Sequence, residues 1–141
     1  ATTLYENWPI DAKSDISMNH IMFGEISAWY YKALGGIRPD PAHPGFKNII
    51  LEPHFVKGLT RFEAYHQGPY GMIVSIWNKD KRKTEYQVTV PANSSATLTL
   101  PALKVKEGNQ SIENNQFVKI VSKESSSVKL SLSPGSYSFT F

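Results

Sequence analysis

The stretch EYQVTV at residues 85–90 alternates polar and apolar side chains at every second position. This period of two predicts a β-strand with one buried face. The stretches at residues 128–132 and 137–141 repeat the pattern near the end of the chain. The side chains expected to face a common core are Tyr86/Val88/Val90, Val128/Leu130/Leu132 and Tyr137/Phe139/Phe141.

Further short runs rich in Val, Ile, Thr, Tyr and Phe surround this stretch, and turn-forming clusters separate them. Strands are expected at residues 49–52, 61–66, 72–77 and 96–100, with weaker candidates near residue 103 and at 117–121. Seven to nine short antiparallel strands predict a mainly β fold, an antiparallel β-sandwich.

A different pattern precedes the strands. Residues 1–19 show no sustained period and are interpreted as a loop, whereas apolar residues at three- and four-residue spacing after it predict one α-helix. Asn19 is its expected N-cap, and Gly35-Gly36 is expected to end it. The apolar stripe of this helix comprises Met22, Ile26, Trp29, Tyr30, Ala33, Leu34 and Ile37.

Three prolines within residues 38–45 forbid a helix and indicate a stiff connector. The expected organisation is therefore a loop plus helix over residues 1–37, a connector over 38–47 and the sandwich over 48–141. The helix has no helical partner in this chain, so its stripe should pack against the sandwich, another copy or a missing domain.

The composition excludes several classes of function. A chain of 141 residues with no cysteine cannot form disulfides or thiolate metal sites. The net charge of +3 comes from scattered basic residues, and the one cluster, at residues 79–83, is interpreted as a turn. We therefore expect no nucleic-acid partner and, without a long apolar run, no membrane span. The histidines at positions 43, 54 and 66 share no metal-ligand spacing, so no metal and no cofactor are expected.

Two side chains near the start could carry chemistry. Glu6 lies beside Tyr5 and Trp8, and a carboxylate among aromatic rings can serve as a general acid or base, although a solvated role is the simpler interpretation. His20, just before the helix, could donate to a ligand hydroxyl or could cap the neighbouring backbone. No nearby acidic residue has a spacing that argues for pairing with Glu6.

Three aromatic residues in the strand region have two interpretations. Tyr65, Tyr70 and Trp77 could form a platform that stacks on sugar rings, or they could fill the core of the sandwich. Solvent exposure would separate these alternatives.

Five runs, taken together, resemble the C-terminal end of a bacterial α-L-rhamnosidase of glycoside hydrolase family 78. They are ATTLYENW at residues 1–8, SMNHIMFG at 17–24, GGIRPD at 35–40, PGFKNI at 44–49 and PYG at 69–71. They follow the family order over about residues 1–92, and the rest of the chain agrees in strand pattern only.

The resemblance implies an (α/α)6-barrel catalytic domain followed by a C-terminal β-sandwich, and hydrolysis with inversion by a Glu general acid and a Glu general base. It places Glu6 at the general base, His20 at a histidine that lines the rhamnose pocket, and Trp8 at an aromatic residue beside the base. The helix would be the last helix of the barrel. The general acid would lie outside this chain, so the chain alone should be inactive.

The function expected from this resemblance is that of a C-terminal piece of an enzyme that removes terminal α-L-rhamnosyl groups, with the sandwich bracing the barrel. The alternatives are a carbohydrate-binding module and a structural domain that mediates assembly. The expected partner is a rhamnose-containing glycoside, and self-association through the helix stripe is a further expectation. The resemblance is compatible with a periplasmic or secreted bacterial parent.

Overall fold

The computed structural model describes residues 5–6 and 17–141. Contacts within the chain divide it into two units, residues 1–30 and residues 31–141. Each unit is considered separately below. The second unit contains every strand among the described residues.

The first sheet of the second unit has five strands in the order β1-β2-β6-β10-β9. Their bounds are Ile37–Pro39 for β1, Asn48–Leu51 for β2, Ser95–Leu100 for β6, Val128–Leu132 for β10 and Val118–Lys123 for β9. Neighbours run antiparallel except β2 and β6, which are parallel, with Asn48 opposite Ser95.

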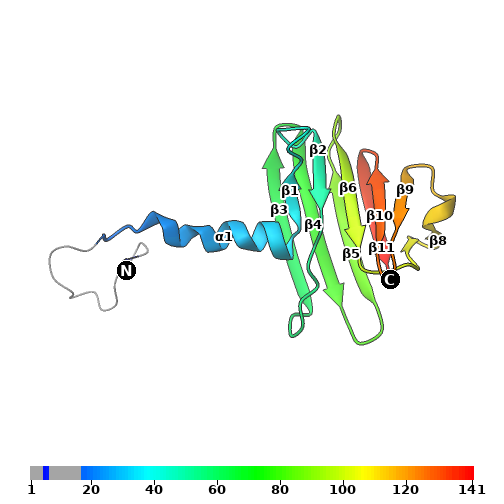
Figure 1. The fold of residues 1–141 in the computed structure, drawn as a ribbon, viewed down its shortest axis with the longest axis horizontal. Coiled ribbons are helices and arrows are strands. Elements are labelled where there is room, and N and C mark those ends of the chain that lie inside the picture. The colour runs from blue at the N-terminus through cyan, green and yellow to red at the C-terminus, as the bar shows by residue number, and fades with distance from the viewer. Residues whose placement is uncertain (1–4, 7–16) are drawn as a thin grey trace. The chain divides into compact units, whose positions relative to one another are not determined.

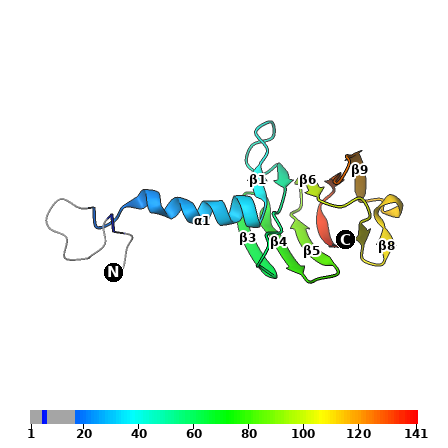
Figure 2. The ribbon, with the colours of Figure 1, turned by 60° about the horizontal axis from the view of Figure 1, so that its bottom comes forward.

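The second sheet has six strands in the order β3-β4-β5-β11-β7-β8, all antiparallel. Their bounds are Arg61–Gly68 for β3, Gly71–Lys79 for β4, Thr84–Val90 for β5, Gly135–Thr140 for β11, Lys106–Glu107 for β7 and Gln110–Ser111 for β8. A short 3-10 helix, η3 (Ile112–Asn114), leads on toward β9. Figures 1 and 2 show the two sheets as layers of one sandwich, which confirms the predicted fold class.

The core lies between the sheets, where the predicted inward faces meet. Eight of the nine side chains expected to face inward are at most 7% exposed, and the ninth, Phe141, packs against the core from its edge. Phe55 contributes a ring that makes edge contacts with Trp77, Tyr86 and Phe141. Burial of alternate side chains from both sheets supplies the main driving force for this fold.

The predicted helix is present as one continuous helical run with three geometries. A 3-10 turn, η1 (Ile21–Gly24), leads into α1 (Glu25–Trp29), and a π-helical turn, η2 (Tyr30–Leu34), ends the run directly before Gly35-Gly36. The N-cap position is held by His20 rather than by the predicted Asn19.

The apolar stripe of this helix divides into an exposed and a buried part. Ile26, Trp29 and Tyr30 are 54%, 49% and 45% exposed, whereas Leu34 and Ile37 are 6% and 4% exposed. Leu34 and Ile37 are thus buried within the second unit, in line with the expected packing of part of the stripe on the sandwich, but Ile37 lies in β1 rather than on the predicted helix.

The last helical carbonyl groups are bonded by the sandwich. The backbone N–H of His54 donates to the carbonyl of Ala33 at 3.0 Å, and the indole N–H of Trp77 donates to that of Leu34 at 2.8 Å. Because the last four carbonyls of a helix have no partner within it, these contacts satisfy groups that would otherwise require water. The last helical turn is thus an integral part of the second unit.

Gly36 allows the chain to leave the helix at this point. Its φ of 68° lies in the left-handed region, and a Cβ atom there would be 2.2 Å from the backbone nitrogen of Pro53. Only glycine satisfies both constraints. The chain then continues into β1. The backbone N–H of Glu52, directly after β2, donates a hydrogen bond to the Gly36 carbonyl at 3.0 Å.

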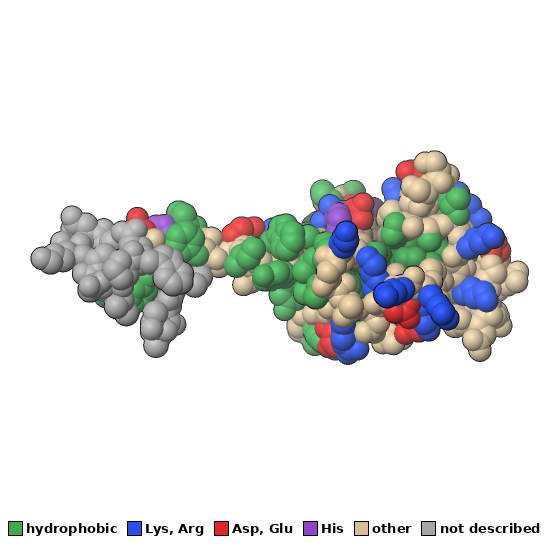
Figure 3. All heavy atoms as spheres, turned by 90° about the horizontal axis from the view of Figure 1, so that it is seen from below, with side chains coloured by type: hydrophobic (Ala, Val, Ile, Leu, Met, Phe, Trp, Pro, Cys, Tyr) green, Lys and Arg blue, Asp and Glu red, His purple; other side chains and the backbone are tan. Residues whose placement is uncertain are grey.

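The charged cluster at residues 79–83 forms the predicted turn between β4 and β5. The Asp80 carboxylate accepts hydrogen bonds from the backbone N–H groups of Arg82 and Lys83, which holds the pKa of Asp80 below its usual range. On the face drawn in Figure 3, basic side chains of the described residues lie among acidic and uncharged ones and form no continuous patch. No helix among these residues has the length and hydropathy needed to span a bilayer.

Candidate functional site

The first candidate site residue, Glu6, is joined to Ser17 by two hydrogen bonds. The Glu6 backbone N–H donates to the Ser17 carbonyl at 2.9 Å, and the Ser17 backbone N–H donates to Oε2 of the Glu6 side chain at 3.0 Å. These reciprocal bonds, which we call the Glu6–Ser17 clasp, join positions eleven residues apart. A carboxylate held through one oxygen still has a second oxygen available to accept a proton.

The second candidate, His20, lies beside the same carboxylate oxygen. Its Nδ1 atom is 3.8 Å from Glu6 Oε2, and the two side chains are 23% and 42% exposed. The imidazole also contacts the ring of Phe23, with 4.9 Å between ring centroids. The structure therefore brings these two predicted site residues close to each other.

His20 caps the start of the helix through its backbone carbonyl and not through its side chain. The carbonyl of His20 accepts a hydrogen bond from the Phe23 N–H at 3.1 Å, but its side chain makes no cap bond. The imidazole is consequently directed to Glu6 and Phe23 rather than to the helix start.

Trp8, the third candidate, lies outside the described residues, as do Asp11 and Asp15. Among the described residues, no group of three or more His, Asp or Glu side chains is arranged to hold a metal ion. The chemistry that the described part of this site offers is thus acid–base and hydrogen-bonding chemistry from one carboxylate and one imidazole.

The three aromatic residues considered as a sugar-stacking platform differ in solvent exposure. Trp77 is fully buried, so its proposed role in sugar stacking was wrong, because its ring fills the core and its N–H is bonded to Leu34. Tyr65 and Tyr70 are 48% and 40% exposed. The Tyr65 hydroxyl donates to Glu63 Oε2 at 2.8 Å, a contact that raises the pKa of Tyr65, and the Lys47 ammonium lies 5.1 Å from the Tyr70 ring centre.

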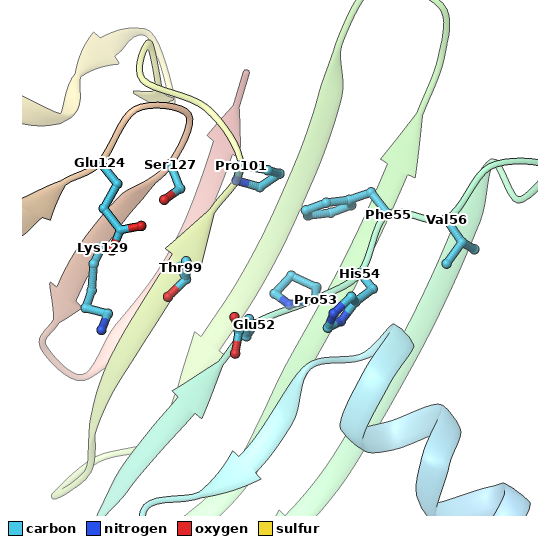
Figure 4. A pocket seen from close by; sticks show the side chains of 10 residues that line it. All are labelled: Glu52, Pro53, His54, Phe55, Val56, Thr99, Pro101, Glu124, Ser127 and Lys129. Atoms are coloured by element: carbon cyan, nitrogen blue, oxygen red, sulfur yellow. The ribbon is translucent and has the colours of Figure 1, made fainter.

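A cleft of about 600 Å³ also opens within the second unit, and Figure 4 shows its lining. Strands β6 and β10 contribute Thr99 and Lys129, and the segment that follows β2 contributes Glu52 and Pro53. The Glu52 carboxylate is ion-paired with Arg38. Of the predicted site residues that the structure describes, neither Glu6 nor His20 lines this cleft.

Neither this cleft nor the contact between Ser17 and Glu6 was predicted from the sequence. A signal for the cleft was present, because Thr99 and Lys129 occupy the polar, outward positions of two alternating strands. No side-chain pattern marks Ser17, since its contacts with Glu6 are made by backbone atoms.

Comparison with known proteins identifies the family. Residues 36–115 match the family described as the bacterial alpha-L-rhamnosidase C-terminal domain. The chain belongs to this family. The match covers β1 through β8, whereas β9, β10 and β11, which also contribute to the core, lie beyond it.

Relatives in this family extend the similarity to the N-terminal part of the chain. An alpha-L-rhamnosidase of Formosa agariphila is 30% identical over 149 aligned residues, which cover 99% of this chain and 16% of the relative. An alpha-L-rhamnosidase of Alteromonas sp. is 33% identical and is matched over 72% of this chain and 12% of its own length. The chain therefore spans about one sixth or less of these relatives.

Solved structures agree with the family. The alpha-L-rhamnosidase from Dictyoglumus thermophilum superposes with a TM-score of 0.83 at 32% identity, over 99% of this chain and 16% of that one. The Streptomyces avermitilis alpha-L-rhamnosidase, complexed with L-rhamnose, gives a TM-score of 0.75 at 22% identity and supports the fold alone. The chain is thus homologous to the C-terminal region of alpha-L-rhamnosidases.

Proposed function

We propose that this chain is the C-terminal part of an inverting α-L-rhamnosidase and that it supplies the general base, Glu6. The observation that carries the proposal is the convergence of the Ser17 amide and the His20 imidazole on Glu6 Oε2, at 3.0 and 3.8 Å. Homology to alpha-L-rhamnosidases over nearly the whole chain supports the substrate class.

In the proposed reaction Glu6 accepts a proton from the water molecule that attacks the anomeric carbon. A second carboxylic acid protonates the departing glycosidic oxygen from the other face of the sugar. Inverting enzymes separate the two carboxyl groups by roughly 6.5–9.5 Å so that the water fits between them. That acid belongs to sequence beyond this chain, which on its own should therefore be inactive.

His20 has the chemistry to hold a hydroxyl of the rhamnosyl group, because an imidazole can donate and accept hydrogen bonds. Its position next to Glu6 would place that hydroxyl near the attacking water. Trp8 is proposed, from the resemblance alone, to contribute an aromatic surface to the same sugar.

The sandwich is proposed to brace the catalytic barrel through the helix. Contacts from His54 and Trp77 make the last helical turn part of the sandwich unit. With residues 1–37 proposed as the end of the barrel, a helix anchored in this way would link the barrel to the sandwich.

The test is a Glu6→Gln variant of the complete enzyme, with Glu124→Gln as a control, since Glu124 lines the cleft of the second unit. The amide cannot accept the water proton, so kcat on an aryl α-L-rhamnoside should fall roughly 100- to 10,000-fold. The control should keep its activity, and proton NMR of the first product should show the inverted anomer. Full activity of Glu6→Gln would exclude the catalytic role.

The alternative, a carbohydrate-binding module, can be tested on the chain itself. Titration with L-rhamnose, followed by NMR, would report binding to the sandwich, and a Tyr65→Ala variant would test its exposed ring. Binding that is lost in Tyr65→Ala would support the alternative, whereas no binding would favour the bracing role.

A further inference from the structure

The Glu6–Ser17 clasp gives a backbone group a direct part in the proposed reaction. We propose that the Ser17 amide is the positioning group of the general base: it holds Oε2 and thereby presents Oε1 to the attacking water. This inference rests on the proposed function, because it assigns a role to Ser17 only if Glu6 is the base.

The geometry favours a positioning role over a simple loop contact. One bond of the clasp, from the Glu6 N–H to the Ser17 carbonyl at 2.9 Å, would be enough to join the backbone at these two positions. The second bond, at 3.0 Å, reaches past the backbone to the side-chain carboxylate. A hydrogen bond to a carboxylate is stronger than one between neutral groups, so it restricts rotation of the side chain about its terminal bond.

The two contacts from other residues converge on the same oxygen atom. Ser17 N and His20 Nδ1 both address Oε2, at 3.0 and 3.8 Å. Within the described residues Oε1 accepts no hydrogen bond, so it is the oxygen that takes the proton when the water O–H bond breaks. In the same step a bond forms between the water oxygen and the anomeric carbon, and the glycosidic bond breaks with the leaving oxygen protonated by the partner acid.

The donor is the main-chain nitrogen of residue 17. The inference can therefore be tested by comparing a substitution that keeps the backbone N–H with one that removes it. Every amino acid except proline supplies a backbone N–H, so the side chain at position 17 is not required. A Ser17→Ala variant keeps the donor and serves as a matched control for Ser17→Pro, which removes it. Both variants keep the Ser17 carbonyl that accepts the other bond of the clasp.

The experiment compares kcat and KM of these variants in the complete enzyme, using an aryl α-L-rhamnoside. We expect Ser17→Pro to lower kcat roughly 10- to 100-fold, the effect of losing one hydrogen bond to a charged group, with KM within about twofold. Ser17→Ala should match the unmodified enzyme. Equal kcat for Ser17→Pro and Ser17→Ala would overturn the inference, as would a loss confined to KM.

A backbone ester at position 17 separates positioning from folding. The ester replaces the N–H by oxygen and avoids the proline ring, so it should reproduce the loss of kcat while thermal melting stays close to that of the unmodified enzyme. If Ser17→Pro fails to fold, the kcat of the ester variant is the test of the inference. An ester variant with full kcat would refute the role of the amide.

Glu6→Gln, measured in parallel, keeps this inference distinct from the proposed function. A strong loss in Glu6→Gln with no loss in the ester variant means that Glu6 is the base but Ser17 does not position it. No loss in Glu6→Gln means that the base itself is misassigned, and the inference fails with it.

Discussion

Trp77, in the middle of the sandwich, donates its indole N–H to the carbonyl oxygen of Leu34 at 2.8 Å. Trp77 is fully buried and Leu34 is 6% exposed. The bond therefore joins the final helical turn to strand β4 within a region closed to water. The neighbouring Gly35 carbonyl accepts a bond from the Ser75 hydroxyl at 2.6 Å, so consecutive carbonyls at the helix end are satisfied by one strand.

Replacing Trp77 with Phe should destabilise the chain. The change removes the donor and leaves the buried Leu34 carbonyl without its partner, at a cost of about 1–3 kcal/mol in the free energy of unfolding. Denaturant unfolding of the isolated chain measures this cost. Trp29→Phe is the matched control, since Trp29 is 49% exposed, and it should change stability by less than about 0.5 kcal/mol.

A Gly36→Ala substitution should be more damaging than the same change at Gly45. Both residues have positive φ, at 68° and 71°, so both substitutions introduce backbone strain of about 1 kcal/mol. A Cβ at Gly36 would also meet Pro53 N at 2.2 Å, whereas a Cβ at Gly45 meets nothing within 4 Å. Thermal melts should therefore show a large loss for Gly36→Ala and a small one for Gly45→Ala. Similar melting temperatures for the two variants would contradict the close approach at Pro53.

Periodicity predicted most of the sandwich because side-chain alternation reports directly which face of a strand is buried. The strand at Val128–Leu132 agrees residue for residue, and the helix ends where Gly35-Gly36 predicted. The parallel pairing of β2 with β6 was not predicted, since strand direction depends on contacts distant in sequence. The two-residue strands β7 and β8 are too short to show a period.

The candidate site was less predictable than the fold. Composition and resemblance selected Glu6 and His20, and the roles proposed for them come from the resemblance. The 3.8 Å approach of these side chains and the contact of Ser17 with Glu6 depend on backbone positions that no side-chain pattern specifies. Backbone donors carry no side-chain signature, so sequence patterns cannot mark them.

Acid should destabilise the sandwich partly through Asp40. Hydrogen bonds from His43, Asn48 and the Ala42 backbone lower the pKa of Asp40 to about 2. Because the folded state binds this proton less tightly than the unfolded chain, Asp40 contributes stability above its ordinary pKa. That contribution should be lost as the pH falls from about 4 to about 2.

An Asp40→Asn variant tests this assignment through melting temperatures measured between pH 2 and pH 6. The melting temperature of the variant should fall less steeply with acid than that of the unmodified chain. Some slope should remain, because bonds from Ser111 and Lys123 lower the pKa of Glu113 to about 2 as well. Parallel curves for the two proteins would show that Asp40 has no part in the acid response.

The isolated chain should self-associate through the exposed part of the helix. Ile26, Trp29 and Tyr30 present apolar side chains that are 45–54% exposed, and we propose that neighbouring barrel helices cover them in the complete enzyme. Leu34, which the sequence placed on the same stripe, is buried and should not take part.

Sedimentation velocity over a range of concentrations measures this association. A Trp29→Lys variant should shift the chain toward monomer, whereas Val121→Lys, at a position 60% exposed on β9, should leave the association unchanged. A wild-type chain that stays monomeric at high concentration would argue against the proposal.

The parallel register of β2 with β6 also constrains the order in which a nascent chain can fold. Strand β2 can pair with β6 only after Ser95, the partner of Asn48, has left the ribosome. The β3–β4 hairpin, in contrast, can form from residues that are close in sequence. Until then β2 presents an open hydrogen-bonding edge, the kind of edge that recruits other chains into aggregates. If translation stalls before residue 95, the nascent chain therefore exposes the unpaired edge of β2 and is prone to aggregate unless a chaperone binds it.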